Sequence, residues 1–221
     1  MSSAEEQLYD ACNWKSNYEK AKQIILANPN LDINFKLYYN RTALHRACYH
    51  GHADIVELLL SHFPNIDLNI EDDYQQTPLL LACWKGHAKV VKILLDDHRG
   101  VDINKLDNGD QTPLWWVACY GYLECVELLL AHIGISQQLD INTKSHYPNT
   151  TAKETAQREG KTEIVALLEA FEANPINIRC NLRMKLGFCL GKNFISFHFI
   201  SFHFSIFDQD FHHFFIELNR I

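Results

Sequence analysis

The chain repeats one pattern of apolar and polar positions. Three segments carry it most clearly: NRTALHRACYHGHADIVELLL at 40–60, QQTPLLLACWKGHAKVVKILL at 75–95 and DQTPLWWVACYGYLECVELLL at 110–130. In each segment, a short stretch with Leu and Ala or Val on one side is followed by Gly and then by a broad apolar face. A fourth, more polar copy covers 151–171. Self-similarity at a fixed period predicts an array of stacked units.

Three landmarks recur in step with this pattern and predict how each unit folds. A Thr begins the repeated stretch, a Gly follows nine residues later, and an Asp-x-Asn tripeptide precedes both. The positions are Thr42, Thr77, Thr112 and Thr151; Gly51, Gly86, Gly121 and Gly160; Asn34, Asn69, Asn104 and Asn142. Because Thr can cap a helix and Gly can end one, we expect a short helix between them and a second helix afterwards. Helices this short do not persist alone in water, so neighbouring units must stabilise them.

The repeated stretch resembles the ankyrin repeat. The family motif Thr-Pro-Leu-His-x-Ala corresponds to TALHRA at 42–47, TPLLLA at 77–82 and TPLWWV at 112–117, with Gly-His at 51–52 and 86–87. The resemblance implies an all-α ankyrin-repeat solenoid of about five stacked helix-turn-helix units with β-turn or hairpin loops, followed by a non-repeat C-terminal tail. The array is expected over 5–172, with units at about 5–39, 40–74, 75–109, 110–148 and 149–172.

Two features of the copies depart from the family pattern. The motif His is present only at His45, and Leu80 and Trp115 replace it in the next two copies. We therefore expect the side-chain hydrogen bond that this His makes in the family to be lost there. The fourth unit also has Val117 where a small residue is usual, which predicts local repacking.

The tail, residues 173–221, does not follow the repeat. It is rich in Phe and His and contains ISFHF twice in tandem, at 195–199 and 200–204. The tail is predicted to be poorly defined, either as a segment without a stable fold or as translated sequence never selected to fold. Its apolar stretch at 194–207 is too short and too polar to predict a membrane span.

Candidate chemistry is sparse. The net charge of −7 argues against nucleic acid as a partner. The sequence has no Cys-x-x-Cys or His-Glu-x-x-His motif, and Cys48, Cys83 and Cys125 are expected in the core, with Cys119 more exposed. We therefore predict no catalytic residues, no metal site, no cofactor and no enzyme activity. A metal-dependent hydrolase using the tail residues His198, His203, His212 and His213 is a weaker alternative.

The cysteines and the N-terminus bear on localisation. The seven Cys are an odd number without disulfide-framework spacing, which favours reduced thiols. No stretch near the N-terminus has the pattern of a signal peptide. We expect a cytoplasmic protein, with the nucleus as an alternative.

The resemblance also implies where a partner would bind, since loop fingertips and first helices line a concave protein-binding surface in this family. The candidate partner-binding residues are Tyr38, Tyr39, Tyr49, His50, Asp72, Asp73, Tyr74, Trp84, Lys85, Asp107, Asp110 and Tyr120. Trp115 and Trp116 are assigned structural roles instead.

Their aromatic and acidic character predicts a protein partner with a basic segment, bound by a monomer. The alternative is an ankyrin-repeat adaptor attached peripherally to a membrane by its Phe-rich tail.

Overall fold

The computed structural model describes residues 2–13, 17–132 and 138–188. Within these residues the chain forms α-helices, one short 3-10 helix at Tyr38–Asn40 and no strand. Ten of the helices form consecutive pairs: α1 (Ala4–Ala11) with α2 (Tyr18–Ala27), α3 (Ala43–His50) with α4 (Ala53–His62), α5 (Pro78–Lys85) with α6 (Ala88–Asp96), α7 (Pro113–Tyr120) with α8 (Leu123–Ala131), and α9 (Ala152–Arg158) with α10 (Thr162–Ala173). An eleventh helix, α11 (Pro175–Lys185), follows them.

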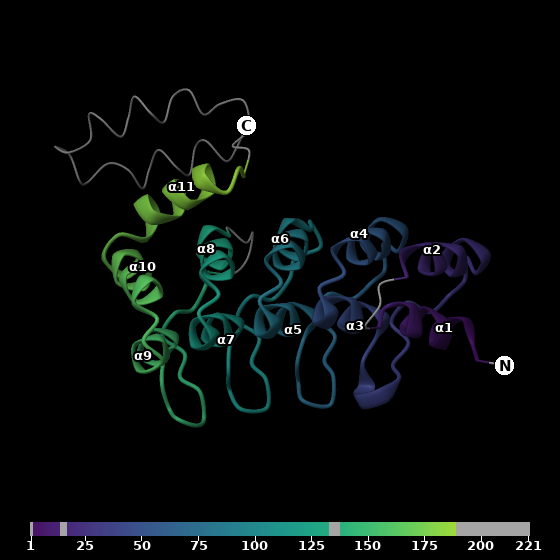
Figure 1. The fold of residues 1–221 in the computed structure, drawn as a ribbon, viewed down its shortest axis with the longest axis horizontal. Helices are drawn as coiled ribbons and strands as arrows, with labels where there is room; N and C mark the ends of the chain where they lie inside the picture. The colour runs from purple at the N-terminus through teal and green to yellow at the C-terminus, as the bar shows by residue number, and fades with distance from the viewer. Residues whose placement is uncertain (1, 14–16, 133–137, 189–221) are drawn as a thin grey trace. The chain divides into compact units, whose positions relative to one another are not determined.

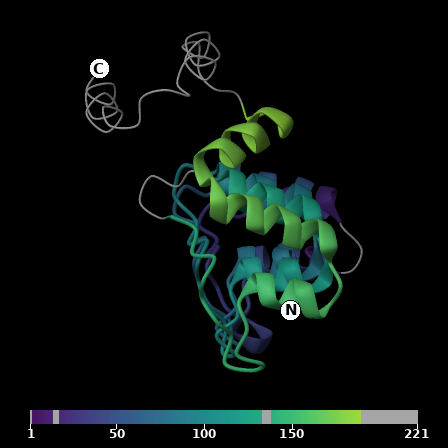
Figure 2. The same cartoon turned by 90° about the vertical axis from the view of Figure 1, so that its left-hand side faces the viewer.

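The pairs stack side by side in two layers. Figure 1 shows the first helices of the pairs in one row, the second helices in another, and hairpin loops extending from the first-helix row. Seen along the stack in Figure 2, the hairpin loops follow one another on one side. The layers meet at a core that includes the fully buried Leu44, Leu79 and Leu114, one from each inner unit. The predicted all-α stack of helix-turn-helix units is confirmed.

The Thr and Gly landmarks fix the ends of the first helices. Thr77 and Thr112 each accept a hydrogen bond from the backbone N–H three residues later, at 3.2 and 3.0 Å. The Pro that follows each Thr occupies the first helical turn, where its missing N–H leaves no hydrogen bond unmade. At the other end, Gly51 and Gly86 adopt left-handed conformations with φ of 75° and 73°. The helix boundaries therefore follow from local residue chemistry.

The same glycines let successive units approach closely. A Cβ added at Gly51 would lie 2.6 Å from the His87 ring, and one at Gly86 would lie 2.7 Å from the Tyr122 ring. Each ring belongs to the following unit, and that of His87 also bonds the Tyr49 carbonyl oxygen at 3.0 Å. Glycine is thus required here both for its φ and for the space that the neighbouring ring fills.

The Asn landmarks join one unit to the next. The Asn69 side-chain amide donates to the Gly100 carbonyl oxygen at 3.2 Å, and its oxygen accepts the Asp102 N–H at 2.7 Å. Asn34 and Asn104 make the equivalent pair of bonds to their own following units. One carboxamide can serve an unpaired carbonyl and an unpaired N–H together, which accounts for the recurrence of Asn at this position.

The hairpin loops bond to one another through the backbone. In the second and third hairpins, the N–H groups of Asp72 and Asp107 donate to carbonyl oxygens four residues later, at 3.1 Å. The last hairpin is one residue longer and closes from Ser145 to Thr150. Between hairpins, the bonds are Asp73 N–H to Tyr39 O, Asn108 N–H to Tyr74 O and His146 N–H to Gly109 O, at 2.9–3.0 Å. We call this series the finger ladder.

His45 adds a side-chain brace between units. Its Nδ1 accepts the Thr42 N–H, so the ring proton lies on Nε2, which donates to the Gln76 carbonyl oxygen at 3.2 Å. We expected this bond to be lost in both later copies. It is lost at Leu80, but the Trp115 indole N–H donates to the Thr150 hydroxyl at 3.4 Å and bridges to the next unit in the same way.

The segment that we assigned to the tail, from 173, contains the folded helix α11. The first compact unit extends to Leu186, because α11 packs against α8 and α10. Arg179 and Arg183 donate to the carbonyl oxygens of Leu130 and Ala131, at 3.2 and 3.1 Å. These carbonyls belong to the last turn of α8 and have no partner within that helix. The helix α11 therefore caps α8, and the repeated Phe-His segment lies outside the described residues.

The close approach at Gly86 gives a test of the unit-to-unit packing. We expect Gly86→Ala to lower the free energy of unfolding by about 2–4 kcal/mol, because left-handed strain adds to overpacking against Tyr122. Gly100→Ala is the matched control: its φ is 82°, but an added Cβ meets no atom of the described residues within 4 Å. Gly100→Ala should lower the free energy of unfolding by only about 1–2 kcal/mol. Urea titrations compare the two, and equal losses would contradict the packing role.

The buried brace at His45 predicts a pH dependence of stability. Burial lowers the pKa of His45 from 6.5 to about 4. As the pH falls from 6.5 to about 4, His45 becomes protonated in the unfolded state but stays neutral in the folded state, so the free energy of unfolding falls. The His45→Leu variant places Leu at this position, as at Leu80. Between pH 7 and pH 4, its free energy of unfolding should fall by less than that of the wild-type chain, with a difference on the order of 3 kcal/mol.

Urea titrations across that pH range measure the difference. The exposed His98 provides the control, since His98→Leu should keep the wild-type dependence. An unchanged pH dependence in His45→Leu would show that the His45 ring does not stabilise the folded state in its neutral form.

Candidate functional site

Four aromatic side chains from three successive units form a continuous row. Tyr49 comes from the last turn of α3, Trp84 from the last turn of α5, and Trp116 and Tyr120 from α7. Their ring centroids are 5.7 Å apart from Tyr49 to Trp84, 5.7 Å from Trp84 to Trp116, and 5.8 Å from Trp116 to Tyr120. The Trp84 indole N–H also donates to the Tyr120 hydroxyl at 3.4 Å. We call these four residues the aromatic row.

The aromatic row is partly open to solvent. Tyr120 is 47% exposed, and the other three rings are half-buried. Because the rings support one another, their orientations are fixed before any partner arrives. Rigid, amphipathic aromatic area of this kind binds a partner at little cost in side-chain entropy.

Trp116 has a structural role, as predicted, but it also belongs to the row. Its indole N–H donates to the Asp107 carboxylate at 2.9 Å, which ties α7 to its hairpin. Its ring stacks on Tyr120, with 10° between the planes. The sequence could have placed Trp116 on the candidate surface, because residues four apart on a helix share a face and Tyr120 was already a candidate.

Two predicted partner-binding residues are removed from the candidate set. The Asp72 and Asp107 side chains are buried, with 5% and 3% of each residue exposed. Asp72 accepts from Arg41 Nε at 2.8 Å and from backbone N–H groups of its own hairpin. Asp107 accepts from Trp116 and from its own hairpin in the same manner. Both carboxylates hold hairpins in shape and are buried away from any partner.

The other predicted fingertip residues are exposed. Tyr38 is 71%, Tyr39 60% and Tyr74 43% exposed, and the last two rings lie 6.1 Å apart. Asp73 and Asp110 are exposed beside them on their hairpins. These five residues, which we call the fingertip group, form a second candidate surface with net negative charge.

Positive charge gathers at the α3 and α5 end of the row. The Lys85 Nζ lies 4.1 Å from the Trp84 ring centroid and 4.6 Å from that of Tyr49. His50 packs edge-on against Tyr49 at 5.0 Å. Burial, followed by the positive charge of Arg46 and other basic neighbours, lowers the pKa of His50 to about 4. The helix end of the surface therefore differs in charge from the fingertip group.

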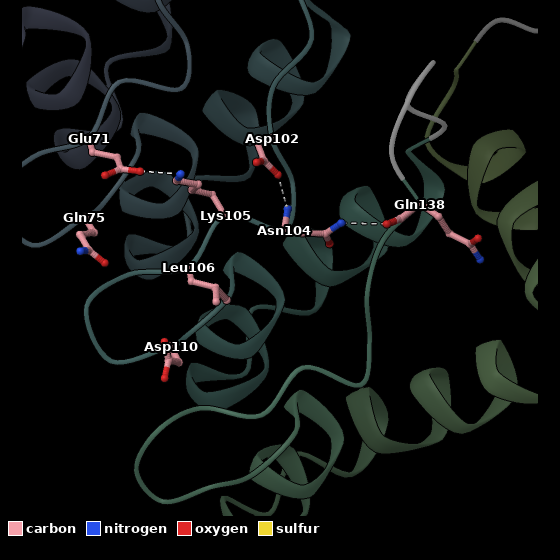
Figure 3. Close-up of a pocket in the computed structure, with 8 residues that line it drawn as sticks. All are labelled: Glu71, Gln75, Asp102, Asn104, Lys105, Leu106, Asp110 and Gln138. Carbon is pink, nitrogen blue, oxygen red and sulfur yellow. Dashed lines mark hydrogen bonds and ion pairs between the residues drawn. The ribbon is translucent and has the colours of Figure 1, made fainter.

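An open polar depression of about 650 Å³ lies along the hairpins (Figure 3). Its lining residues are Glu71, Gln75, Asp102, Asn104, Lys105, Leu106, Asp110 and Gln138. The Glu71 and Lys105 side chains pair at 2.5 Å, so those charges compensate each other. None of the described lining residues is Ser, Thr, Cys or His, so the depression has no hydroxyl or thiol nucleophile beside an imidazole base.

Four of the described cysteines, Cys48, Cys83, Cys119 and Cys125, lie in surroundings that suppress reactivity. Cys48, Cys83 and Cys125 are buried as expected, and burial raises the pKa of Cys125 to about 12. Burial also raises the pKa of the half-exposed Cys119, so this thiol remains protonated at neutral pH. Among the described residues, no group of three or more His, Cys, Asp or Glu is placed to hold a metal ion.

The two alternative functions based on the tail depend on residues that the structure does not describe. The four His of the hydrolase hypothesis and the apolar stretch of the membrane hypothesis lie outside the described residues. Over residues 2–13, 17–132 and 138–188, no helix has the length and apolarity to cross a membrane.

Comparison with known families agrees with this architecture. A family model described as Ankyrin repeats (3 copies) matches residues 8–107, and a second, described as Ankyrin repeat, matches residues 109–144. A comparison with curated proteins found no match. Together the two family matches span more than half of the chain, and they coincide with the stacked pairs from α1 to α8. The chain belongs to the ankyrin-repeat family.

Proposed function

We propose that this chain is a non-catalytic interaction module whose protein partner binds across the aromatic row and the fingertip group. Ankyrin repeats generally mediate protein–protein interactions. The observation that carries the proposal for this chain is the continuous contact of four aromatic rings over three units. Trp and Tyr dominate the energetics of protein interfaces when they are packed and partly desolvated.

The spacing of the units suggests the size of the partner segment. Packed helices lie about 8–10 Å apart, so a row over three units is roughly 20 Å long. An extended peptide of about six residues, at roughly 3.3 Å per residue, matches this length. The proposed ligand is therefore a short linear segment or one exposed edge of a folded protein.

Charge contributes a second element to the proposal. We expected a basic partner segment from a set of finger acids, but Asp72 and Asp107 are satisfied internally and Glu71 pairs with Lys105. Asp73 and Asp110 remain exposed. The proposed preference for a basic group is therefore restricted to the fingertip group.

We also propose that the chain binds as a monomer in a reducing compartment, the cytoplasm or the nucleus. The polar helix α9 and the added helix α11 cover the C-terminal end of the stack, which argues against further stacking on that side. The six described cysteines are free, as a reducing compartment would keep them.

The row predicts a specific loss of partners on substitution. Affinity purification from cell extract with mass spectrometry first identifies proteins retained by the wild-type chain. Trp84→Ala and Tyr49→Ala should each weaken the binding of a retained protein by about 2 kcal/mol, roughly 30-fold in Kd.

The control is Leu26→Ala, which removes an apolar side chain that is 63% exposed on α2, in the other layer. It should leave binding unchanged. If the wild-type chain and both aromatic variants recover the same amount of the partner protein, the proposal for this surface is wrong.

A further inference from the structure

Lys85 differs from the described lysines that pair with a carboxylate. Lys92, Lys105, Lys153 and Lys185 each pair with a carboxylate. Among the described residues, the Lys85 ammonium has no such partner and instead lies over the rings of Trp84 and Tyr49. An ammonium group has three N–H donors, and ring contacts do not satisfy them as a carboxylate does. Lys85 is thus a cation held in place beside the aromatic row, with donors available to an anion.

The surroundings of Lys85 reinforce its charge. The Arg46 guanidinium donates to the neutral Asn13 side chain and lies over the Tyr9 ring, 5.2 Å from its centroid. In the described part of the chain Arg46 forms no ion pair, and its Nε is buried without a hydrogen-bond partner. Of the basic groups that act on His50, Arg46 and Lys85 carry a positive charge at neutral pH. The local potential at this end of the row is therefore positive.

This positive end stands out against the charge of the array. Residues 1–173 contain 15 basic and 24 acidic residues, a net charge of −9. A general preference for cations would follow from that total, yet the helix end of the binding surface has the opposite sign. A segment that crosses the row meets positive charge at the helix end and negative charge at the fingertip group. This charge pattern sets both the direction in which the segment binds and its composition.

We propose that Lys85, held by Trp84 and Tyr49, binds an Asp or Glu carboxylate of the partner, so that the occupant of the aromatic row is an acidic protein segment. The inference rests on the proposed function and adds the chemistry of the partner to it. A carboxylate here completes the hydrogen bonds of the Lys85 ammonium, while the adjoining residues of the segment cover the Trp84 and Tyr120 rings. The positive charge of Lys85 is already oriented, so little side-chain entropy is lost on binding.

A displayed library of random 12-residue peptides tests the composition of the ligand. The library is selected on the immobilised full-length chain, and the enriched peptides are then measured against variants by fluorescence anisotropy. We expect wild-type selection to enrich peptides with Asp or Glu, and we expect these peptides to require Trp84.

Charge reversal at Lys85 tests its role. Lys85→Glu should weaken an enriched acidic peptide by about tenfold or more, and Lys85→Met, which keeps the aliphatic stem, by about fivefold. Lys85→Arg should retain binding. The matched control is Lys89→Glu, the same charge change at an exposed position on α6, which should alter binding less than about twofold. Circular dichroism confirms that each variant is folded.

The outcomes separate this inference from the proposed function. Enriched peptides that require Trp84 but lack an acidic bias would overturn the inference and leave the proposed function intact. Acidic peptides that bind Lys85→Glu as well as wild type would also overturn it. Peptides insensitive to Trp84→Ala, or no enrichment at all, would contradict both.

Discussion

The structure depends on each unit supplying contacts that its neighbour lacks. A first helix of seven or eight residues and a second of nine to twelve are too short to persist alone. What stabilises them is the neighbour: the His87 ring fills the space over Gly51, the Tyr122 ring fills that over Gly86, and each hairpin donates backbone bonds to the one before it. The repeat period is the spacing at which these contacts can recur.

The same constraint creates the candidate binding surface. Because the landmarks are occupied with holding units together, the side chains just before each Gly are free to vary. Stacking then aligns them, so Tyr49 and Trp84 become neighbours although they are 35 residues apart. Their contacts leave Lys85 as an oriented cation. A surface of defined chemistry thus arises largely from positions outside the landmarks that hold the units together.

Much of the fold could be predicted from the sequence, because the capping Thr, the left-handed Gly and the apolar periods act locally. What escaped prediction depends on long-range contacts. The burial of Asp72 requires Arg41, which lies 31 residues earlier in the chain, and the brace at Trp115 requires Thr150 in the following unit. The helix α11 was assigned to the tail because the repeated pattern ends before it, whereas its place in the structure depends on contacts with α8 and α10, including the α8 carbonyl groups that it caps.

The finger ladder explains how the last hairpin tolerates an extra residue. The Asn landmark precedes the repeated Thr by eight residues in the first three copies and by nine in the fourth, because the last hairpin contains one more residue than its predecessors. His146 nevertheless donates to Gly109, as Asn108 does to Tyr74. Because these bonds join backbone atoms, the register between hairpins does not depend on side-chain identity or on small differences in hairpin length. A fingertip can therefore gain a residue or change its side chains while the units remain stacked.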